Sequence, residues 1–394
     1  MPEIDKNNPN LDFLEIDDYP KNDHLKLVRF FCYDIFEITL VKMSVVATVY
    51  VSLLITLAQT YLFLQNFNLK YFIQYVPMYF VLQFVTVSCC GVLSLSKEMS
   101  SMLKELRMFV PKDKNHEIFK KMKKEAKIIN FVVTALLVSG MISGFLILVP
   151  TEKDEDLYFI YDLIRDYTLP AWKTPLSFLF SISVAFYAFV VLANLTQFIY
   201  GAYHIKYQIE ITTVNCIQRI HDLCESRDCN CGQHQEQIKE ILKFVILSQC
   251  RLTNYGTNVV KKLWPVIASY SLFGGLFFIS MLFLMLTVEH TFISYAKIIP
   301  IYITGTLTGI SVIMLGQNIE DSSVKAFNDL CTLKWYNWNK ENKKIYLIML
   351  SNQMVPFKIK FSENIAVNYK LGFKICRTVY SVVSVLIQMR NAKF

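Results

Sequence analysis

Polar side chains recur at a regular spacing through the last apolar segment of the chain. The intervals between them are 4, 3, 4, 3 and 4 residues, at Lys370, Lys374, Arg377, Ser381, Ser384 and Gln388. A period of about 3.5 residues places all of them on one face of a helix. A cation near the centre of a bilayer costs about 2.5–3.5 kcal/mol, so this face must meet water. The spacing therefore predicts the wall of a water-filled ion path, and the alternative is an ordinary cytosolic flank on a tilted span.

A second group of side chains has the chemistry of a metal site. His221, Cys224, Cys229, Cys231 and His234 offer imidazole and thiolate ligands, but their spacing matches no common zinc pattern. We expect a solvated cytosolic loop here and no bound metal. The sequence also lacks a P-loop, a dinucleotide-binding loop, a metalloprotease helix and a nucleophile elbow. It therefore predicts neither an enzyme nor a cofactor.

The elements that would hold the polar stripe are membrane spans. Of the 394 residues, 54% are hydrophobic and 14% aromatic, which is too apolar for an ordinary soluble protein of this size. Six uncharged runs exceed the roughly 18 residues that a span requires: 43–69, 71–96, 128–151, 174–205, 263–288 and 298–319. The uncharged run between Arg377 and Arg390 has only twelve residues, so it is too short to cross alone. With this last segment, the sequence predicts an all-α membrane protein with seven transmembrane helices.

The distribution of Lys and Arg predicts how these spans are oriented. Twenty-eight lie in the connections 97–127, 206–262 and 320–377, against seven in the other connections and after Met389. Positive loops stay in the cytosol, so we expect a cytosolic N-terminus and an extracellular C-terminus, with the first span directing insertion. Since this distribution accounts for the net charge of +8, we expect no nucleic acid partner.

Two other classes of membrane protein fit the sequence less well. A G-protein-coupled receptor has the opposite polarity, and no cysteine lies in a predicted outer loop, where such receptors commonly form a disulfide. A proton-coupled transporter needs ionisable residues within its spans, and the six long runs contain no Asp, Glu, Lys or Arg. Both classes stay as alternatives.

The topology predicts four segments. Residues 1–37 form a cytosolic N-terminal segment, in which 24–36 is an amphipathic helix on the inner membrane surface. Residues 38–319 hold spans one to six. Residues 320–362 form a cytosolic anchor segment, joined there by the projecting ends of spans four to six. Residues 363–394 hold the seventh helix, which we expect to begin near Ser362, and a short extracellular tail.

The third cytosolic connection resembles the C-terminal signature of insect odorant receptors. Its sequence, LGQNIEDSSVKAFNDLCTLKWYNWNKENKKIYLIMLSNQMVP, has a Gly-Gln pair closing span six, a Ser pair, an Ala-aromatic step, a Trp-Tyr turn and a later Pro. These positions are Gly316, Gln317, Ser322, Ser323, Ala326, Phe327, Trp335, Tyr336 and Pro356. The resemblance covers the topology of the whole chain and specific residues over about the last 80. Ser381, Val382 and Met389 depart from the ending of the sister gustatory receptors, which stay as the alternative.

This resemblance implies a ligand-gated, non-selective cation channel with four subunits. It implies that the last helix lines the pore through Ser381, Ser384, Val385 and Gln388. Val385 would be the apolar gate, and Gln388 the outer polar ring. The basic residues of the stripe are awkward for a cation path, and lateral exits between subunits, as the family has, would let ions leave before reaching Lys370.

The resemblance also implies partners and a location. Trp335 and Tyr336 would belong to a cytosolic assembly surface. The connection 206–262 is shorter than that of the family's co-receptor (Orco), which implies a ligand-selective subunit that forms a heterotetramer with the co-receptor. The expected location is the plasma membrane of the sensory dendrite of olfactory neurons, where the chain would pass the lipid bilayer several times.

In this family the ligand pocket lies in the outer halves of spans two, three, four and six. The corresponding side chains are Tyr75, Met78, Tyr79, Ile142, Phe145, Leu146, Phe178, Ser181, Tyr302 and Thr306. Aromatic walls with few hydroxyl groups suit a volatile apolar odorant, and the alternative for each residue is plain packing.

Overall fold

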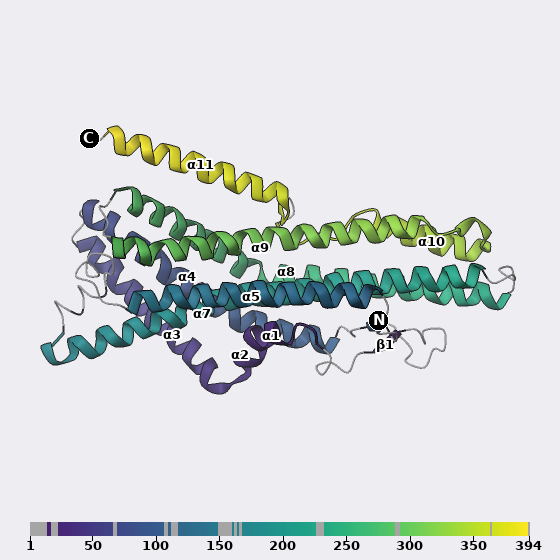
Figure 1. Cartoon of the computed structure of the whole chain (residues 1–394), viewed down its shortest axis with the longest axis horizontal. Coiled ribbons are helices and arrows are strands. Elements are labelled where there is room, and N and C mark those ends of the chain that lie inside the picture. The colour runs from purple at the N-terminus through teal and green to yellow at the C-terminus, as the bar shows by residue number, and fades with distance from the viewer. Residues whose placement is uncertain are drawn as a thin grey trace.

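Long helices make up most of the chain (Figure 1). The computed structural model describes residues 14–16, 23–65, 69–105, 109–111, 117–148, 160, 164, 168–225, 232–287, 292–362 and 365–392. In these residues the long helices are α3 (Thr39–Gln65), α4 (Leu69–Glu105), α5 (Glu117–Leu148), α7 (Pro170–Glu225), α8 (Gly232–Thr287), α9 (Phe292–Cys331) and α11 (Tyr369–Ala392). Short strands form two antiparallel pairs, β1 (Leu14–Ile16) with β2 (Phe109–Pro111) and β3 (Lys360–Ser362) with β4 (Ile365–Ala366). The predicted all-α class is confirmed.

Six of the described helices are long and apolar enough to cross a membrane. These spans are Thr39–Gln65, Gln74–Glu98, Glu117–Leu146, Pro170–Cys224, Trp264–Leu286 and Tyr295–Cys331, and each contains most or all of one predicted run. The helix α11 corresponds to the predicted seventh helix. Its uncharged run lies between Arg377 and Arg390, as the sequence predicts. The side of the membrane on which each terminus lies stays a prediction.

The fourth and fifth spans continue far beyond a bilayer. The helices α7 and α8 have 56 residues each, about 84 Å, whereas a hydrocarbon core is about 30 Å thick. Their far ends pack with the end of α9, the 3-10 turn Trp335–Asn337 and α10 (Lys340–Gln353), which lie together at one end of the molecule (Figure 1). We call this end the anchor layer. Its helices bury apolar residues at Ile238, Ile241, Leu242 and Val245, the spacing of an amphipathic helix.

The N-terminal segment is helical, as predicted, but packs differently. It consists of α1 (Lys26–Arg29), the π-helical turn Phe30–Asp34 and α2 (Ile35–Glu37). The apolar stripe Leu25, Val28, Cys32 and Phe36 is at most 1% exposed, because it packs against the bundle. The stripe that suggested a lipid-facing surface therefore faces protein.

Candidate functional site

The helix α11 stands apart from the bundle over most of its length. It leaves α9 halfway along the molecule and diverges toward the C-terminus (Figure 1), and it packs against α8 and α9. Five residues of the polar stripe are exposed and Ser384 is half-buried. Val385 is 54% exposed, and Phe373 and Tyr380 on other sides of the helix are also exposed. A single chain therefore leaves both the polar and the apolar sides of α11 uncovered.

Gly316 of α9 is the point of closest approach to the segment that enters α11. A Cβ atom on Gly316 would lie well inside contact distance of the Val367 carbonyl oxygen and 2.8 Å from Val367 Cγ1. Val367 is buried, and its N–H donates to the Ile359 carbonyl at 2.8 Å, so it is held in place. Only a residue without a side chain permits this approach. The glycine of the motif thus brings the base of α11 against α9.

Gln317, the next residue, links α9 to the first turn of α11. Its Oε1 accepts the N–H of Tyr369 at 3.2 Å, while its Nε2 donates to Asp321 at 2.8 Å. An N–H of the first helical turn has no partner within the helix, so this side chain satisfies one of the free donors of α11. We call the contacts of Gly316, Gln317 and Glu320 with residues 367–369 the α9–α11 joint.

Asn368 caps α11 and completes the joint. Its Oδ1 accepts the N–H of Leu371 at 3.2 Å, and its Nδ2 donates to Glu320 of α9 at 3.2 Å. Glu320 also lies 2.7 Å from the Lys358 ammonium. The helix therefore begins at Tyr369, and our prediction of a start near Ser362 is wrong because Ser362 lies in β3.

The Ser pair of the motif makes two different contacts. Ser322 Oγ donates to Glu210 Oε1 of α7 at 2.9 Å. Ser323 Oγ accepts the N–H of Phe357 at 2.9 Å, in the chain that leads to β3. The pair therefore holds α9 between the long helix α7 and the segment that enters α11.

Glu210 also belongs to a network of ion pairs between α5 and α7. Its Oε2 lies 2.9 Å from Lys121 Nζ, and Lys206 Nζ lies 2.7 Å from Glu125 Oε2. Lys206 is buried, and its ammonium is 5.6 Å from the centre of the Tyr203 ring. A buried cation needs such partners because its hydration is lost. With Ser322, this network connects three helices close to the joint.

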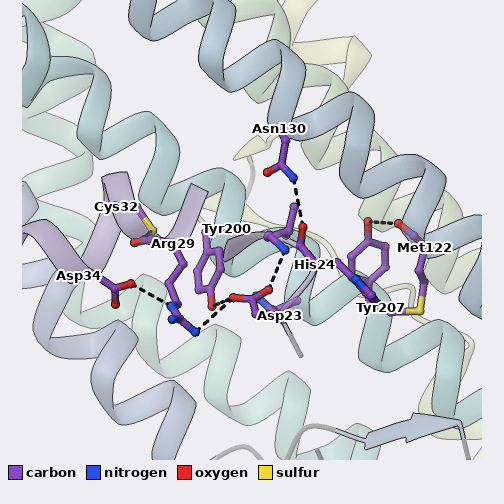
Figure 2. A network of polar contacts seen from close by, with 11 residues as sticks. Asp23, His24, Arg29, Cys32, Asp34, Met122, Asn130, Tyr200 and Tyr207 are labelled. Atoms are coloured by element: carbon purple, nitrogen blue, oxygen red, sulfur yellow. Dashed lines mark hydrogen bonds and ion pairs between the residues drawn. The ribbon is translucent and has the colours of Figure 1, made fainter. Parts of the chain in front are cut away.

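Asp23 fixes the N-terminal segment to α7 (Figure 2). Its Oδ2 accepts the hydroxyl of Tyr200 at 2.9 Å, and its Oδ1 accepts the N–H of Leu25 at 2.8 Å. Arg29 Nη1 lies 3.7 Å from the same carboxylate, and Arg29 Nε donates to Asp34 at 3.2 Å. The Asp23 side chain is buried, so these partners replace its water.

The same segment is held against α5. The Asn130 amide donates to the His24 carbonyl at 3.1 Å, and the His24 and Phe119 rings are 4.9 Å apart (Figure 2 shows Asn130 and His24). On the other side, Gln197 of α7 donates to the Cys32 carbonyl at 2.8 Å. The N-terminal segment is therefore clamped between α5 and α7.

The aromatic residues of the anchor layer divide into buried and exposed ones. Trp335 and Tyr336 are 39% and 60% exposed, whereas Trp338 is 3% exposed and packs edge-on against Tyr346. Burial raises the pKa of Tyr346 to about 12, and its protonated hydroxyl donates to the Leu330 carbonyl at 2.9 Å. Our sequence reasoning missed Trp338, which lies one turn beyond the resembling Trp-Tyr pair. The two predicted assembly residues are available to a partner surface.

A cavity of about 250 Å³ lies in the anchor layer between α7, α8, α9 and α10. Its wall includes Ile209, Cys250, Ala326 and Met349, and the side chains of Gln353 and Gln249 are hydrogen-bonded across it. The wall has no charged side chain. It lies in a different part of the molecule from the predicted ligand residues.

The structure divides the predicted ligand residues between the interior and the surface of the bundle. Buried or half-buried are Tyr75, Met78, Tyr79, Leu146 and Tyr302. Exposed are Ile142, Phe145, Phe178 and Thr306, and the side chain of Ser181 lies outside the described part. On α4 the first three lie opposite α3, where the Thr60 hydroxyl is 3.3 Å from the Tyr79 hydroxyl. As ligand contacts, all ten stay predictions.

Gln59 of α3 is a polar residue that our sequence reasoning did not single out. It is fully buried beside α4, and its Nε2 donates to the Tyr75 carbonyl at 3.0 Å. An amide side chain in the middle of an uncharged, mostly apolar run was the signal that could have found it.

The predicted absence of a metal site is not decided by the structure. The described residues contain no group of three His, Cys, Asp or Glu side chains that could hold an ion. Cys229 and Cys231, however, lie outside the described residues.

Comparison of the fold with solved structures gives a clear likeness. The chain resembles the insect olfactory receptor OR5 from Machilis hrabei in complex with eugenol, with a TM-score of 0.67 and 10% sequence identity over 93% of this chain and 97% of that one. A structure of the same receptor described without eugenol gives a TM-score of 0.64 and 9% identity over the same shares. No protein-family model and no curated protein sequence matches the chain. The likeness at this identity establishes the fold.

Proposed function

We propose that the chain is the ligand-selective subunit of an odorant-gated, non-selective cation channel. The observation that carries the proposal is α11, a helix whose polar stripe one chain leaves largely exposed. A water-facing stripe beside exposed apolar residues requires water on one side and lipid or protein on the others. Several copies of α11 around a central path satisfy both requirements. The fold of a solved olfactory receptor supports the same function.

The α9–α11 joint offers a route from ligand to pore. The helix α9 spans the bundle, contains Tyr302 in its outer part and holds the base of α11 through Gly316 and Gln317. An odorant that moves the outer part of α9 would therefore change the position of α11. Shifting a channel from 1% to 99% open requires about 5.5 kcal/mol of differential binding. An odorant with about 10–15 heavy atoms at about 0.3–1 kcal/mol per atom supplies that much.

In this proposal the pore has an apolar constriction and a polar mouth. Val385 closes the path by excluding water, and Gln388 lies one turn further out. Ser381 and Ser384 lie on the same side, each with its hydroxyl donating to a carbonyl of its own helix. Their free lone pairs face the path and favour cations. Cations leave sideways between subunits before they reach the basic residues at the base of α11.

Assembly uses the anchor layer and the co-receptor. Trp335 and Tyr336 are large aromatic side chains on an otherwise polar turn, and aromatic residues of this kind are common at the centre of interfaces. We propose that they contact neighbouring subunits in a heterotetramer that contains the co-receptor (Orco), in the plasma membrane of an olfactory dendrite. The anchor layer is then cytosolic. An epitope tag at the N-terminus should be reached by antibody only after permeabilisation.

Expression in cells under voltage clamp tests the proposal. The chain with the co-receptor should give a cation current within milliseconds to seconds of applying an odorant, with G-protein signalling blocked. The matched control is the co-receptor alone, which should not respond to the same odorant. A current that requires G protein would favour a G-protein-coupled receptor, and substrate flux without channel-like conductance would favour a transporter. A response to a polar, non-volatile tastant without the co-receptor would favour the gustatory alternative.

A further inference from the structure

The start of α5, which is cytosolic in the orientation of the proposed function, carries an exposed basic face that the proposed channel does not use. Lys120, Lys123, Lys124 and Lys127 are all exposed. In the part of the chain that the structure describes, no carboxylate lies within ion-pair distance of any of the four. Lys121 on the same turn contrasts with them, because its ammonium is bound to Glu210. Four neighbouring cations without partners favour a negatively charged ligand.

The same face becomes apolar directly after the last of these lysines. Ile128, Phe131 and Val132 are 55%, 75% and 37% exposed. At about 100° per residue, Lys120, Lys124, Lys127 and Phe131 lie within about 60° of helix arc. The helix rises about 10 Å over the seven steps from Lys120 to Lys127, enough to cross the headgroup layer of about 5–8 Å on one side of a bilayer. The face therefore passes from charged groups at headgroup depth to apolar groups at acyl-chain depth.

The N-terminal segment lies beside this face and extends it. It is docked on α5 by the His24 and Phe119 rings and by the bond from Asn130 to the His24 carbonyl. On its outer side Lys26 is exposed, and so are the apolar side chains of Leu27 and Phe30. Two neighbouring elements thus present the same combination of lysine and apolar side chains.

We propose that this face binds an anionic phospholipid of the cytosolic leaflet. The four lysines of α5 and Lys26 bind its phosphate groups, and Ile128, Phe131 and Phe30 contact its acyl chains. Clusters of Lys next to a span attract anionic lipids, each Lys contributing about 1 kcal/mol, or roughly a fivefold change in affinity. The lipid also holds the N-terminal segment against α5, because it contacts both.

Binding of a short-chain lipid to the purified full-length chain in detergent tests the proposal. The probe is dioctanoyl phosphatidylinositol 4,5-bisphosphate, and the measurement is its dissociation constant and the rise in melting temperature that it causes. At roughly fivefold for each Lys, the variant K120Q/K123Q/K124Q/K127Q should bind about 600-fold more weakly. The matched control K325Q/K334Q/K340Q/K344Q removes the same charge from exposed lysines of the anchor layer, and should bind within about twofold of wild type.

Three further arms decide the kind of ligand. Dioctanoyl phosphatidylcholine should not bind, and inositol trisphosphate should bind at least about tenfold more weakly than the lipid, because it lacks acyl chains. F131S, which keeps every charge, should weaken the lipid but not inositol trisphosphate. If the quadruple variant does not fold, the double variants K120Q/K124Q and K123Q/K127Q replace it. Each removes two lysines and should lower the logarithm of the affinity by about half as much. Equal binding by the two quadruple variants, or equal binding of lipid and soluble headgroup, would overturn the proposal.

Discussion

Replacing Gly316 by alanine tests the α9–α11 joint with a single methyl group. The new Cβ would overlap the Val367 carbonyl oxygen and lie 2.8 Å from Val367 Cγ1. Neither atom can give way easily, because Val367 is buried and its N–H is bonded to Ile359. The base of α11 must therefore move away from α9. Such overpacking costs about 1–3 kcal/mol, against which alanine gains about 1 kcal/mol of helix propensity.

The assay compares this variant with the same substitution elsewhere on α9. Gly309 has nothing within 4 Å of the position of a Cβ atom, so G309A gains helix propensity without an overlap. We expect G309A to keep its melting temperature and odorant response, or to melt slightly higher. G316A should shift the half-maximal odorant concentration by about 5–30-fold, which corresponds to about 1–2 kcal/mol at the joint. Equal dose–response curves for the two variants at equal surface expression would refute the role of the joint.

Three further predictions follow from the site. W335A should reduce co-purification with the co-receptor while the chain stays folded, whereas W338A should destabilise the chain itself by about 3–5 kcal/mol, since only Trp338 is buried; equal effects of the two on folding would contradict the division between them. E210Q removes one of the two carboxylate partners of Lys121 and Lys206, which both keep Glu125, and should lower the free energy of unfolding. The loss should be smaller than the about 3–5 kcal/mol of a fully buried pair, because Lys121 is half exposed. E236Q, in an exposed pair, should leave the free energy of unfolding unchanged. V385S should raise the resting current by easing entry of water, and Q388E should increase the share of current carried by divalent cations. If neither the resting current nor the divalent share changes, Val385 and Gln388 do not line the pore.

The number and limits of the spans could be predicted from the sequence, because long uncharged runs have few alternatives. The inward and outward faces of those spans could not. In a membrane the residues that face lipid are as apolar as those that face protein, so Ile142 and Phe178 look no different in sequence from Tyr75 and Met78. The structure exposes the first two and buries the others. Only polar exceptions such as Gln59 carry a signal of orientation.

The joint illustrates a different limit. The resemblance pointed to Gly316, Gln317 and the Ser pair, but their physical roles depend on partners far away in the chain, from 34 residues for Ser323 to 112 for Ser322. No local pattern predicts such pairs. For the same reason our reasoning placed the start of α11 near Ser362, although Asn368, the residue that caps the helix, has a side chain typical of that position. The apolar stripe of the N-terminal segment was readable, but whether it met lipid or protein was not.

Accessibility of cysteines along α11 tests the central claim most directly. Each residue from 378 to 389 is replaced by cysteine in turn, and an externally added, membrane-impermeant thiol reagent is applied while the odorant-evoked current is recorded. Our account predicts block at 381, 384, 385 and 388, with reaction at 381 and 384 faster when the channel is open, since they lie inside the Val385 constriction. Because the co-receptor contributes subunits to the same path, block is expected to be partial, and its pattern along the helix is the decisive result. Equal block at 382, 383 and 386, on the other side of the helix, would show that the stripe does not line the ion path.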